Sequence, residues 1–95
     1  MDTMDTDVVD NPQENRFEMA VDGAVAFAEY RREDGRIHLL HTEVPQELSG
    51  RGIGSRLAKG VFETLRGQGS RVVAQCPFMA GYAARHPEYA ALIDE

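Results

Sequence analysis

The sequence predicts a single domain of the α+β class, and three features of its apolar pattern lead to that prediction. Residues 16–44 alternate apolar and polar side chains with the period of a β-strand, and two Asp-Gly turn signals interrupt the alternation. Ile53–Leu65 then carries apolar residues at helical spacing. Arg71–Cys76 is a short apolar run with the length of a strand. The length of 95 residues leaves room for one such domain.

The first half of the chain is expected to form three strands in an antiparallel meander. Phe17, Met19 and Val21 fall on one side of the first strand, because successive side chains in a strand point to opposite faces. The turn signals are short enough to join each strand to the next one as a hairpin. The expected strands are residues 16–21, 24–31 and 36–44.

The second half is expected to add a long helix, a fourth strand and two short helices. The buried face of the long helix consists of Ile53, Leu57, Val61 and Leu65. Gly67–Gly69 ends this helix, and Arg71–Cys76 follows as a buried type of strand. A strand–helix–strand crossover pairs the fourth strand parallel to the third. Pro77 and Pro87 each suit the first position of a short C-terminal helix.

The composition is typical of a cytoplasmic globular protein, with 42% hydrophobic and 27% charged residues. Residues 1–14 are acidic and polar, so a flexible tail is expected there, followed by one domain over residues 15–95. No apolar run approaches the ~20 residues of a membrane span, and no secretory signal pattern is expected. Cys76 is the one cysteine, which excludes an internal disulfide framework and a Cys-rich zinc site and suits a reducing compartment.

The charges are distributed unevenly along the chain. The net charge of −6 argues against nucleic-acid binding, because nucleic-acid-binding domains are usually basic. Residues 1–47 carry twelve acidic and four basic side chains, whereas residues 48–95 carry four acidic and six basic ones. An anionic ligand is therefore expected in the second half, and a small phosphorylated molecule suits it better than a polynucleotide.

The glycine-rich segment Gly50-Arg51-Gly52-Ile53-Gly54 is the first candidate binding element. It opens the long helix, where unpaired backbone N–H groups and the helix dipole favour an anion. Arg51, Arg56 and Lys59 add positive charge nearby. The spacing differs from that of a P-loop, and Ser55 stands where a dinucleotide-binding fingerprint needs its third glycine. A plain glycine turn that caps a helix is the alternative.

These motifs resemble a known superfamily. Val44-Pro45, Leu48, Gly50–Gly54 and Leu57 together resemble the acyl-CoA-binding motif of the GNAT N-acetyltransferases. More narrowly, the chain resembles a subfamily of small stand-alone N-acetyltransferase domains, through the segments His41–Pro45, Cys76-Pro77-Phe78, Tyr82 and His86–Tyr89. The resemblance covers residues 16–93 and departs from the motif at Ser49, where the pattern has Gln or Arg.

The resemblance implies a minimal GNAT-like fold that binds acetyl-CoA or CoA and transfers an acetyl group to an amine. The acceptor is expected to be a small molecule or a macromolecule such as a protein lysine, and the protein is expected to be a monomer. The residues expected to bind the cofactor, from the resemblance together with the charges near the loop, are Val44, Gly50, Arg51, Gly52, Ile53, Gly54, Ser55, Arg56 and Phe78.

Four side chains are candidates for the chemistry: His41, Glu43, Cys76 and Tyr82. Glu43 ends the third strand, where GNAT enzymes often place a base, and His41 points to the same side of that strand. The resemblance implies that Cys76 accepts the acetyl group or donates a proton, and that Tyr82 protonates the leaving thiolate. The alternatives are an exposed strand-end acid, a half-buried histidine, a small buried thiol and a tyrosine with a buried ring.

Other functions remain open from the sequence. A CoA-binding or sensing module with little catalysis would have the same loop, since a fold does not guarantee an activity. A cysteine hydrolase or a redox protein could be built on Cys76. No metal site is expected, because His38 and His41 point to opposite faces of one strand. His86 and Tyr89 are expected to fix the C-terminal turn against the body of the domain.

Overall fold

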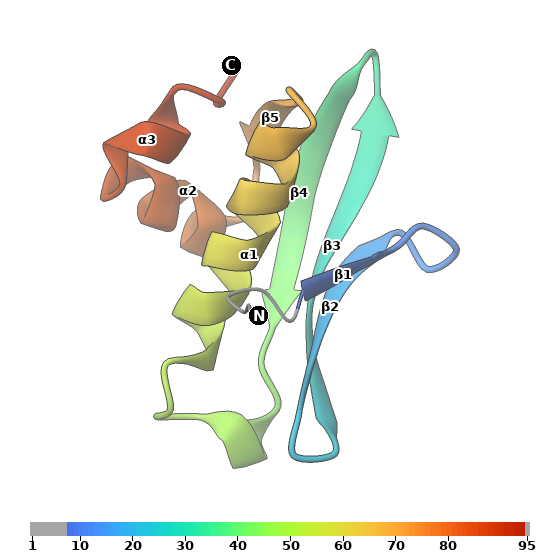
Figure 1. Cartoon of the computed structure of the whole chain (residues 1–95), viewed down its shortest axis with the longest axis vertical. Helices are drawn as coiled ribbons and strands as arrows, with labels where there is room; N and C mark the ends of the chain where they lie inside the picture. Colours follow the sequence, from blue (N-terminus) through green and yellow to red (C-terminus); the bar gives the residue numbers. More distant parts are fainter. Residues whose placement is uncertain (1–7, 95) are drawn as a thin grey trace.

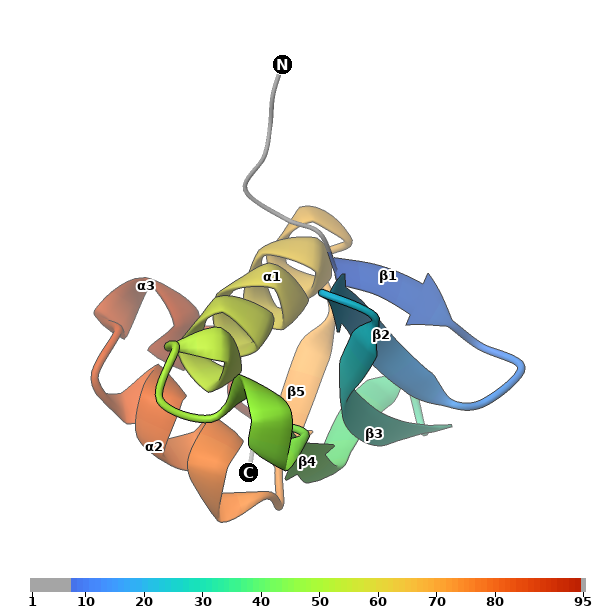
Figure 2. The same ribbon diagram turned by 90° about the horizontal axis from the view of Figure 1, so that it is seen from below.

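The computed structural model describes residues 8–94 and places a five-stranded sheet beside helices that all lie on one of its faces (Figures 1 and 2). The strands follow one another across the sheet in chain order, and β4 and β5 pair in parallel. The strands are β1 (Val8–Asn11), β2 (Arg16–Val21), β3 (Ala24–Glu33), β4 (Arg36–Glu43) and β5 (Arg71–Ala74). The α+β class, the antiparallel meander and the parallel crossover strand are thereby confirmed.

Three α-helices and one turn of 3₁₀-helix complete the domain. Their bounds are 3₁₀-helix Gln46–Leu48, α1 Ile53–Gly67, α2 Pro77–Ala84 and α3 Pro87–Ala90. Pro77 and Pro87 occupy the first turns of α2 and α3, as their fixed φ angle predicts. No helix within residues 8–94 is both long and apolar enough to cross a membrane.

The first strand of the sheet shows that the expected tail over residues 1–14 is wrong in its second part. Val8–Asn11 pairs antiparallel with β2, while residues 1–7 lie outside the described residues. The hydroxyl of Tyr30 donates a 2.5 Å hydrogen bond to Asp10, and Arg32 forms an ion pair with the same carboxylate at 3.1 Å. These partners stand at least twenty residues further along the chain, so a polar segment becomes a strand through tertiary contacts.

The core lies between one face of the sheet and the apolar face of α1. The fully buried residues of α1 are Leu57, Ala58, Val61, Phe62 and Leu65. On the sheet side, the buried residues of β2, β3 and β4 are Phe17, Met19, Ala26, Ala28, Tyr30, Ile37 and Leu39. Burial of this single continuous cluster is the main force that holds α1 on the sheet. The opposite face of the meander carries the charged and half-buried side chains.

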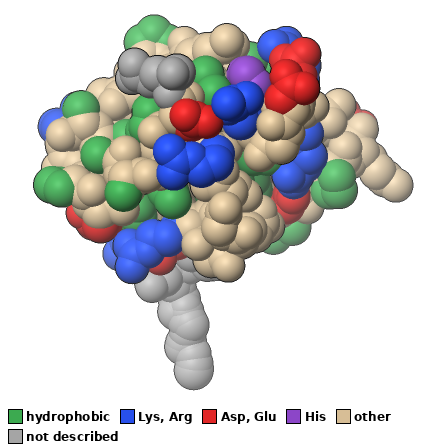
Figure 3. Space-filling view, turned by 90° about the horizontal axis from the view of Figure 1, so that it is seen from above, with side chains coloured by type: hydrophobic (Ala, Val, Ile, Leu, Met, Phe, Trp, Pro, Cys, Tyr) green, Lys and Arg blue, Asp and Glu red, His purple; other side chains and the backbone are tan. Residues whose placement is uncertain are grey.

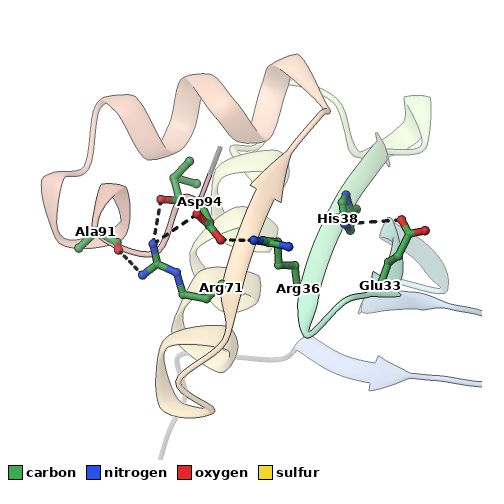
Figure 4. Close-up of polar contacts among 7 residues, drawn as sticks. Glu33, Arg36, His38, Arg71, Ala91 and Asp94 are labelled. Carbon is green, nitrogen blue, oxygen red and sulfur yellow. Dashed lines mark hydrogen bonds and ion pairs between the residues drawn. The ribbon is translucent and has the colours of Figure 1, made fainter.

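The C-terminal segment is bound to the start of the β4–β5 ladder. Asp94 accepts a 2.6 Å hydrogen bond from Arg36 and lies 4.0 Å from Arg71, and Figure 4 shows the two arginines on either side of it. The hydrogen bond from Arg36 holds the pKa of Asp94 below its ordinary value. Acidic and basic side chains stand next to one another on this end of the molecule (Figure 3). We call Arg36, Arg71 and Asp94 the C-terminal clasp.

Candidate functional site

The glycine-rich loop leaves a row of backbone amides without protein acceptors at the head of α1. The Ser49 amide donates to the Gln46 carbonyl, and the next bonded amide is that of Arg56, which donates to Gly52 at 3.2 Å. Between them, the amides of Gly50–Ser55 bond no acceptor within residues 8–94. Gly50 and Gly52 have φ angles of 80° and 71°, which side chains other than glycine rarely adopt. We call Gly50–Ser55 the amide cradle.

The glycines of the cradle are needed for two different reasons. A Cβ atom on Gly50 or Gly52 would meet nothing within 4 Å, so the left-handed backbone is what requires glycine there. Gly54 is already helical, but its Cβ would lie 3.0 Å from Cζ of Phe78. Phe78 therefore packs its partly exposed ring directly over the first turn of α1. The loop therefore combines left-handed glycines with exposed backbone at a helix start, which favours an anionic ligand.

Not every residue expected at the cofactor offers its side chain. Ile53 is buried in the core and Val44 packs partly against it, so the exposed groups they can offer a ligand are backbone groups. Arg51 forms a 2.9 Å ion pair with Asp22 in the β2–β3 turn. Ser55 and Arg56 are exposed on the first turn of α1. The positive charge nearest the cradle thus comes from Arg56 on α1 and from Arg51, which is also paired with Asp22 in the β2–β3 turn.

Strands β4 and β5 part beside the cradle. Their ladder ends at the pair Leu39 and Ala74. The Leu39 carbonyl then accepts hydrogen bonds from the amides of both Gln75 and Cys76, at 3.0 and 2.9 Å. The sequence predicts a strand over Arg71–Cys76, but β5 ends at Ala74. Because the amides of Gln75 and Cys76 share one acceptor, the chain leaves the ladder there and enters α2. Beyond this point β4 pairs with β3 alone, through His41, Thr42 and Glu43.

A β-bulge in β4 decides which of its side chains face the opening. Tyr30 pairs with Leu39, but the next residue of β3, Glu29, pairs with His41, so Leu40 is an extra residue. An unbroken register would place His41 and Glu43 on the buried face. With the bulge, they lie on the exposed face, and Thr42 lies opposite buried Ala28 instead. Bulges re-aim side chains in this way.

His41 and Glu43 form a pair on the exposed face of the sheet. His41 Nε2 lies 3.0 Å from the Glu43 carboxylate, and each side chain is more than half exposed. A carboxylate accepts hydrogen bonds, so Nε2 carries the proton. The structure therefore brings these two candidates together, but it places them on the side of β4 away from the thiol of Cys76.

Cys76 lies where the chain leaves β5 and enters α2. It is the N-cap of α2 and is 5% exposed. Its Sγ atom lies 3.3 Å from Oγ1 of Thr42, which is the one hydrogen-bonding side chain that Sγ contacts within the described residues. Sequence reasoning missed Thr42. The adjacent Leu39 and Leu40 break the polar-apolar alternation and are the signal that would have indicated the bulge.

Tyr82 stands in a stack of aromatic rings rather than in the open. Its ring is parallel to those of His86 and Phe62, with centroids 4.0 and 6.1 Å away. Burial raises the pKa of the Tyr82 hydroxyl, and the Glu88 carboxylate raises it further. The hydroxyl therefore stays protonated at neutral pH, as a proton donor must.

His86 and Tyr89 hold the C-terminal helices, as the sequence predicts. Nδ1 of His86 donates to the Tyr82 carbonyl at 2.8 Å. The Tyr89 hydroxyl donates to Glu63 of α1 at 2.5 Å, and burial raises its pKa. Neither residue contacts Cys76 by a hydrogen bond within residues 8–94. Histidine, cysteine and acidic side chains form no metal-binding group of three or more in the same range.

An apolar pocket of about 370 Å³ lies between β5, α2 and α3. Its lining consists of Val73, Ala74, Ala80, Ala83, Ala84, Ala90 and Ile93. None of the residues of the cradle and none of the four catalytic candidates lines it. The residues that line the pocket carry no polar side chain that could orient a reacting group.

A meander that leads into a helix with a glycine-rich start, followed by a strand parallel to the last strand of the meander, is the arrangement that the resemblance to the GNAT class predicts. The comparisons with known proteins agree. The family model of the GCN5-related N-acetyltransferases matches residues 16–92, so the chain belongs to that family.

One solved structure of the same kind is a GCN5-like candidate N-acetyltransferase from Staphylococcus aureus, determined by NMR in solution. This chain is 27% identical to it, with a TM-score of 0.69, and the match covers 97% of this chain and 91% of the other. A comparison with curated proteins gives no match. Membership of this family makes the chain an acyltransferase.

Proposed function

We propose that this protein transfers an acetyl group from acetyl-CoA to an amine, with Cys76 as its catalytic residue. The observation that carries the proposal is the continuity between two features. The amide cradle opens at the head of α1, and the thiol of Cys76 lies where β4 and β5 separate, on the chain segment that leads into Phe78. A ligand with an anionic middle and a reactive end fits this path.

The cradle suits the pyrophosphate of acetyl-CoA. The amides of Gly50–Ser55 are unpaired within the described residues and belong to a helix N-terminus, whose dipole stabilises an anion. Arg51 and Arg56 add positive charge. From there, Phe78 offers its exposed ring edge and Leu40–Glu43 offers a strand edge without a partner strand on one side. These groups would hold the arm that leads to the thioester.

Acetyl-CoA supplies an activated acetyl thioester. In the proposed first step, Cys76 Sγ forms a bond to the acetyl carbon, and the bond from that carbon to the CoA sulfur breaks. The proton that Cys76 loses balances the one gained by the CoA thiolate. We propose that the Tyr82 hydroxyl, protonated at neutral pH, donates that proton and takes up the one released by Cys76. In the second step an amine takes the acetyl group, and Cys76 is restored.

The acceptor is proposed to be a macromolecular amine such as a protein lysine. The His41–Glu43 pair is exposed at the end of β4, on the face away from Cys76, so it can take a proton from an amine that approaches over the sheet before that amine reaches the acetylated thiol. The domain has helices on one face of the sheet only, so a large acceptor can reach this end (Figure 2). We further propose a monomer that works in the reducing cytoplasm, where a free thiol persists.

A CoA-binding module with little catalysis is the second candidate. The observation that favours it is the surrounding of Cys76, where neither His41 nor His86 forms a hydrogen bond to the thiol within residues 8–94. Histidine is the usual partner of a nucleophilic cysteine. Binding of CoA and acetyl transfer must therefore be measured separately.

Titration calorimetry with acetyl-CoA tests binding, and intact-mass spectrometry after incubation tests transfer. The proposal expects saturable binding, one added acetyl group on the wild-type chain and none on Cys76→Ala. Binding without any acetyl transfer, to the protein or to lysine peptides, supports the binding module instead. Equal turnover of lysine peptides by the wild type and by Cys76→Ala removes the thiol from the mechanism.

A further inference from the structure

Thr42 is held against the thiol of Cys76 by the bulge in β4. In an unbroken register, Thr42 would lie opposite Phe27 on the exposed face of the sheet. The extra residue Leu40 instead brings it opposite Ala28, on the face that carries α1. Threonine is branched at Cβ, which restricts its side chain to few rotamers. Its hydroxyl is therefore presented to the β4–β5 opening in a defined direction.

The contact between Thr42 and Cys76 spans the point where the two strands no longer pair. Oγ1 and Sγ lie 3.3 Å apart, within the range of a hydrogen bond to sulfur. The backbone of Cys76 is fixed by the hydrogen bond from its amide to the Leu39 carbonyl. The Cys76 side chain makes no capping bond to the amides of α2. Within the described residues, Thr42 is thus the polar side chain that can act on the sulfur.

The geometry points to Thr42 as the positioning residue of Cys76: its hydroxyl donates to Sγ when the sulfur is a thiolate and fixes the direction from which it attacks. This inference rests on the proposed role of Cys76. The hydroxyl proton is not transferred, so the atom balance of the thioester exchange is unchanged. A hydrogen bond to the charged form of a group favours that form, and the thiolate is the reactive form of cysteine.

The test compares Thr42→Val, which keeps the shape, with Thr42→Ser, which keeps the hydroxyl. The rate of alkylation of Cys76 by iodoacetamide is measured against pH, and Cys76→Ala gives the background. We expect Thr42→Val to lower the rate of alkylation at neutral pH about tenfold, because the hydroxyl contact to Sγ is lost. Thr42→Ser should stay within about twofold of the wild type.

Thr64→Val is the matched control, because the Thr64 hydroxyl donates within α1 to the Gly60 carbonyl at 2.8 Å. It should leave the alkylation profile unchanged. If Thr42→Val fails to fold, Thr42→Ala takes its place with the same expectation. A wild-type profile for the hydroxyl-free variants overturns the inference, and so does an equal loss in Thr42→Ser. Alkylation needs no acetyl-CoA, so this result stands apart from any failure of acetyl transfer.

Discussion

The parallel ladder of β4 and β5 is closed at one end and open at the other. At its start, Arg36 and Arg71 hold Asp94, and Val72 exchanges backbone hydrogen bonds with the C-terminal segment. At its finish, the Leu39 carbonyl accepts two amides and β4 continues without β5. Buried backbone groups need partners, so the end of the ladder where β4 continues without β5 is where we propose that a ligand supplies them.

The largest expected effect is on the rate of acetyl transfer, and it should distinguish two tyrosines of the same aromatic stack, Tyr82 and Tyr89. Tyr82→Phe keeps the ring but removes the proposed proton donor, so kcat for acetyl transfer should fall about a hundredfold or more. Tyr89→Phe removes the hydrogen bond to Glu63 and should cost about 1 kcal/mol of stability with little change in kcat. Steady-state rates and thermal unfolding of both variants provide the measurement. Equal rates for Tyr82→Phe and the wild type would exclude a role for that hydroxyl.

The second comparison is between two glycines with similar left-handed φ angles, Gly52 in the amide cradle and Gly35 in the β3–β4 turn. Gly52 and Gly35 have φ angles of 71° and 75°, and a Cβ atom on either would meet nothing within 4 Å. Valine at each position should cost ~1–2 kcal/mol of stability through the left-handed backbone. Only Gly52→Val should also weaken acetyl-CoA binding, by about tenfold or more, because it obstructs the cradle. Calorimetry that finds the same affinity in both variants contradicts the cradle.

The sequence predicts the body of the fold because its signals there are local. Alternation and Asp-Gly turns specify the hairpins from Arg16 to Glu43, and a one-sided apolar pattern specifies α1. β1 was not predictable in the same way. Asp10 and its neighbours look like tail residues until Tyr30 and Arg32 are folded against them.

The sequence identifies residues of the candidate site, but it does not show on which face of the sheet their side chains lie. Motifs indicated Gly50–Ser55 and Cys76, which lie at the open end of the ladder. The bulge at Leu40 changes the parity of β4, which separates Glu43 from the thiol and brings Thr42 to it. The adjacent Leu39 and Leu40 indicate an irregularity, but the residues of β3 that β4 then pairs with depend on both strands and not on the order of residues in β4 alone.

A smaller effect, on stability, is expected where α1 and α2 meet, at Gly54 of the cradle. Glycine to alanine within a helix usually adds up to about 1 kcal/mol of stability. Gly81→Ala should show that gain, because its Cβ would lie 3.5 Å from the Arg85 side chain, an ordinary contact. Gly54→Ala should not, because its Cβ would lie 3.0 Å from the ring of Phe78.

Denaturant unfolding of both variants measures this difference, and a double mutant identifies its cause. In the Phe78→Ala background the ring is gone, so Gly54→Ala should recover the helical gain. If Gly54→Ala is as stabilising as Gly81→Ala in the wild-type background, Phe78 does not pack tightly over α1, and its proposed contact with the cofactor arm loses its support.

The smallest effect tests the closed end through its pH dependence. Arg36 lowers the pKa of Asp94 below 3.8, so the clasp adds stability above the unfolded value and loses it as the pH falls through the folded one. Asp94→Asn should be less stable than the wild type at neutral pH, and the difference should shrink as the pH falls through the lowered pKa of Asp94.

Glu18, whose pKa Arg16 also lowers, titrates in both proteins, so the difference between the two melting curves is the readout of the clasp. Glu14→Gln is the control, since the exposed Glu14 side chain forms no ion pair within residues 8–94, and it should follow the wild type. Because the clasp and the cradle occupy opposite ends of the ladder, Asp94→Asn should bind acetyl-CoA with unchanged affinity wherever it is folded. Weakened binding would mean that the C-terminal segment sets the spacing of β4 and β5 along their whole length, and the two ends would then act as one unit.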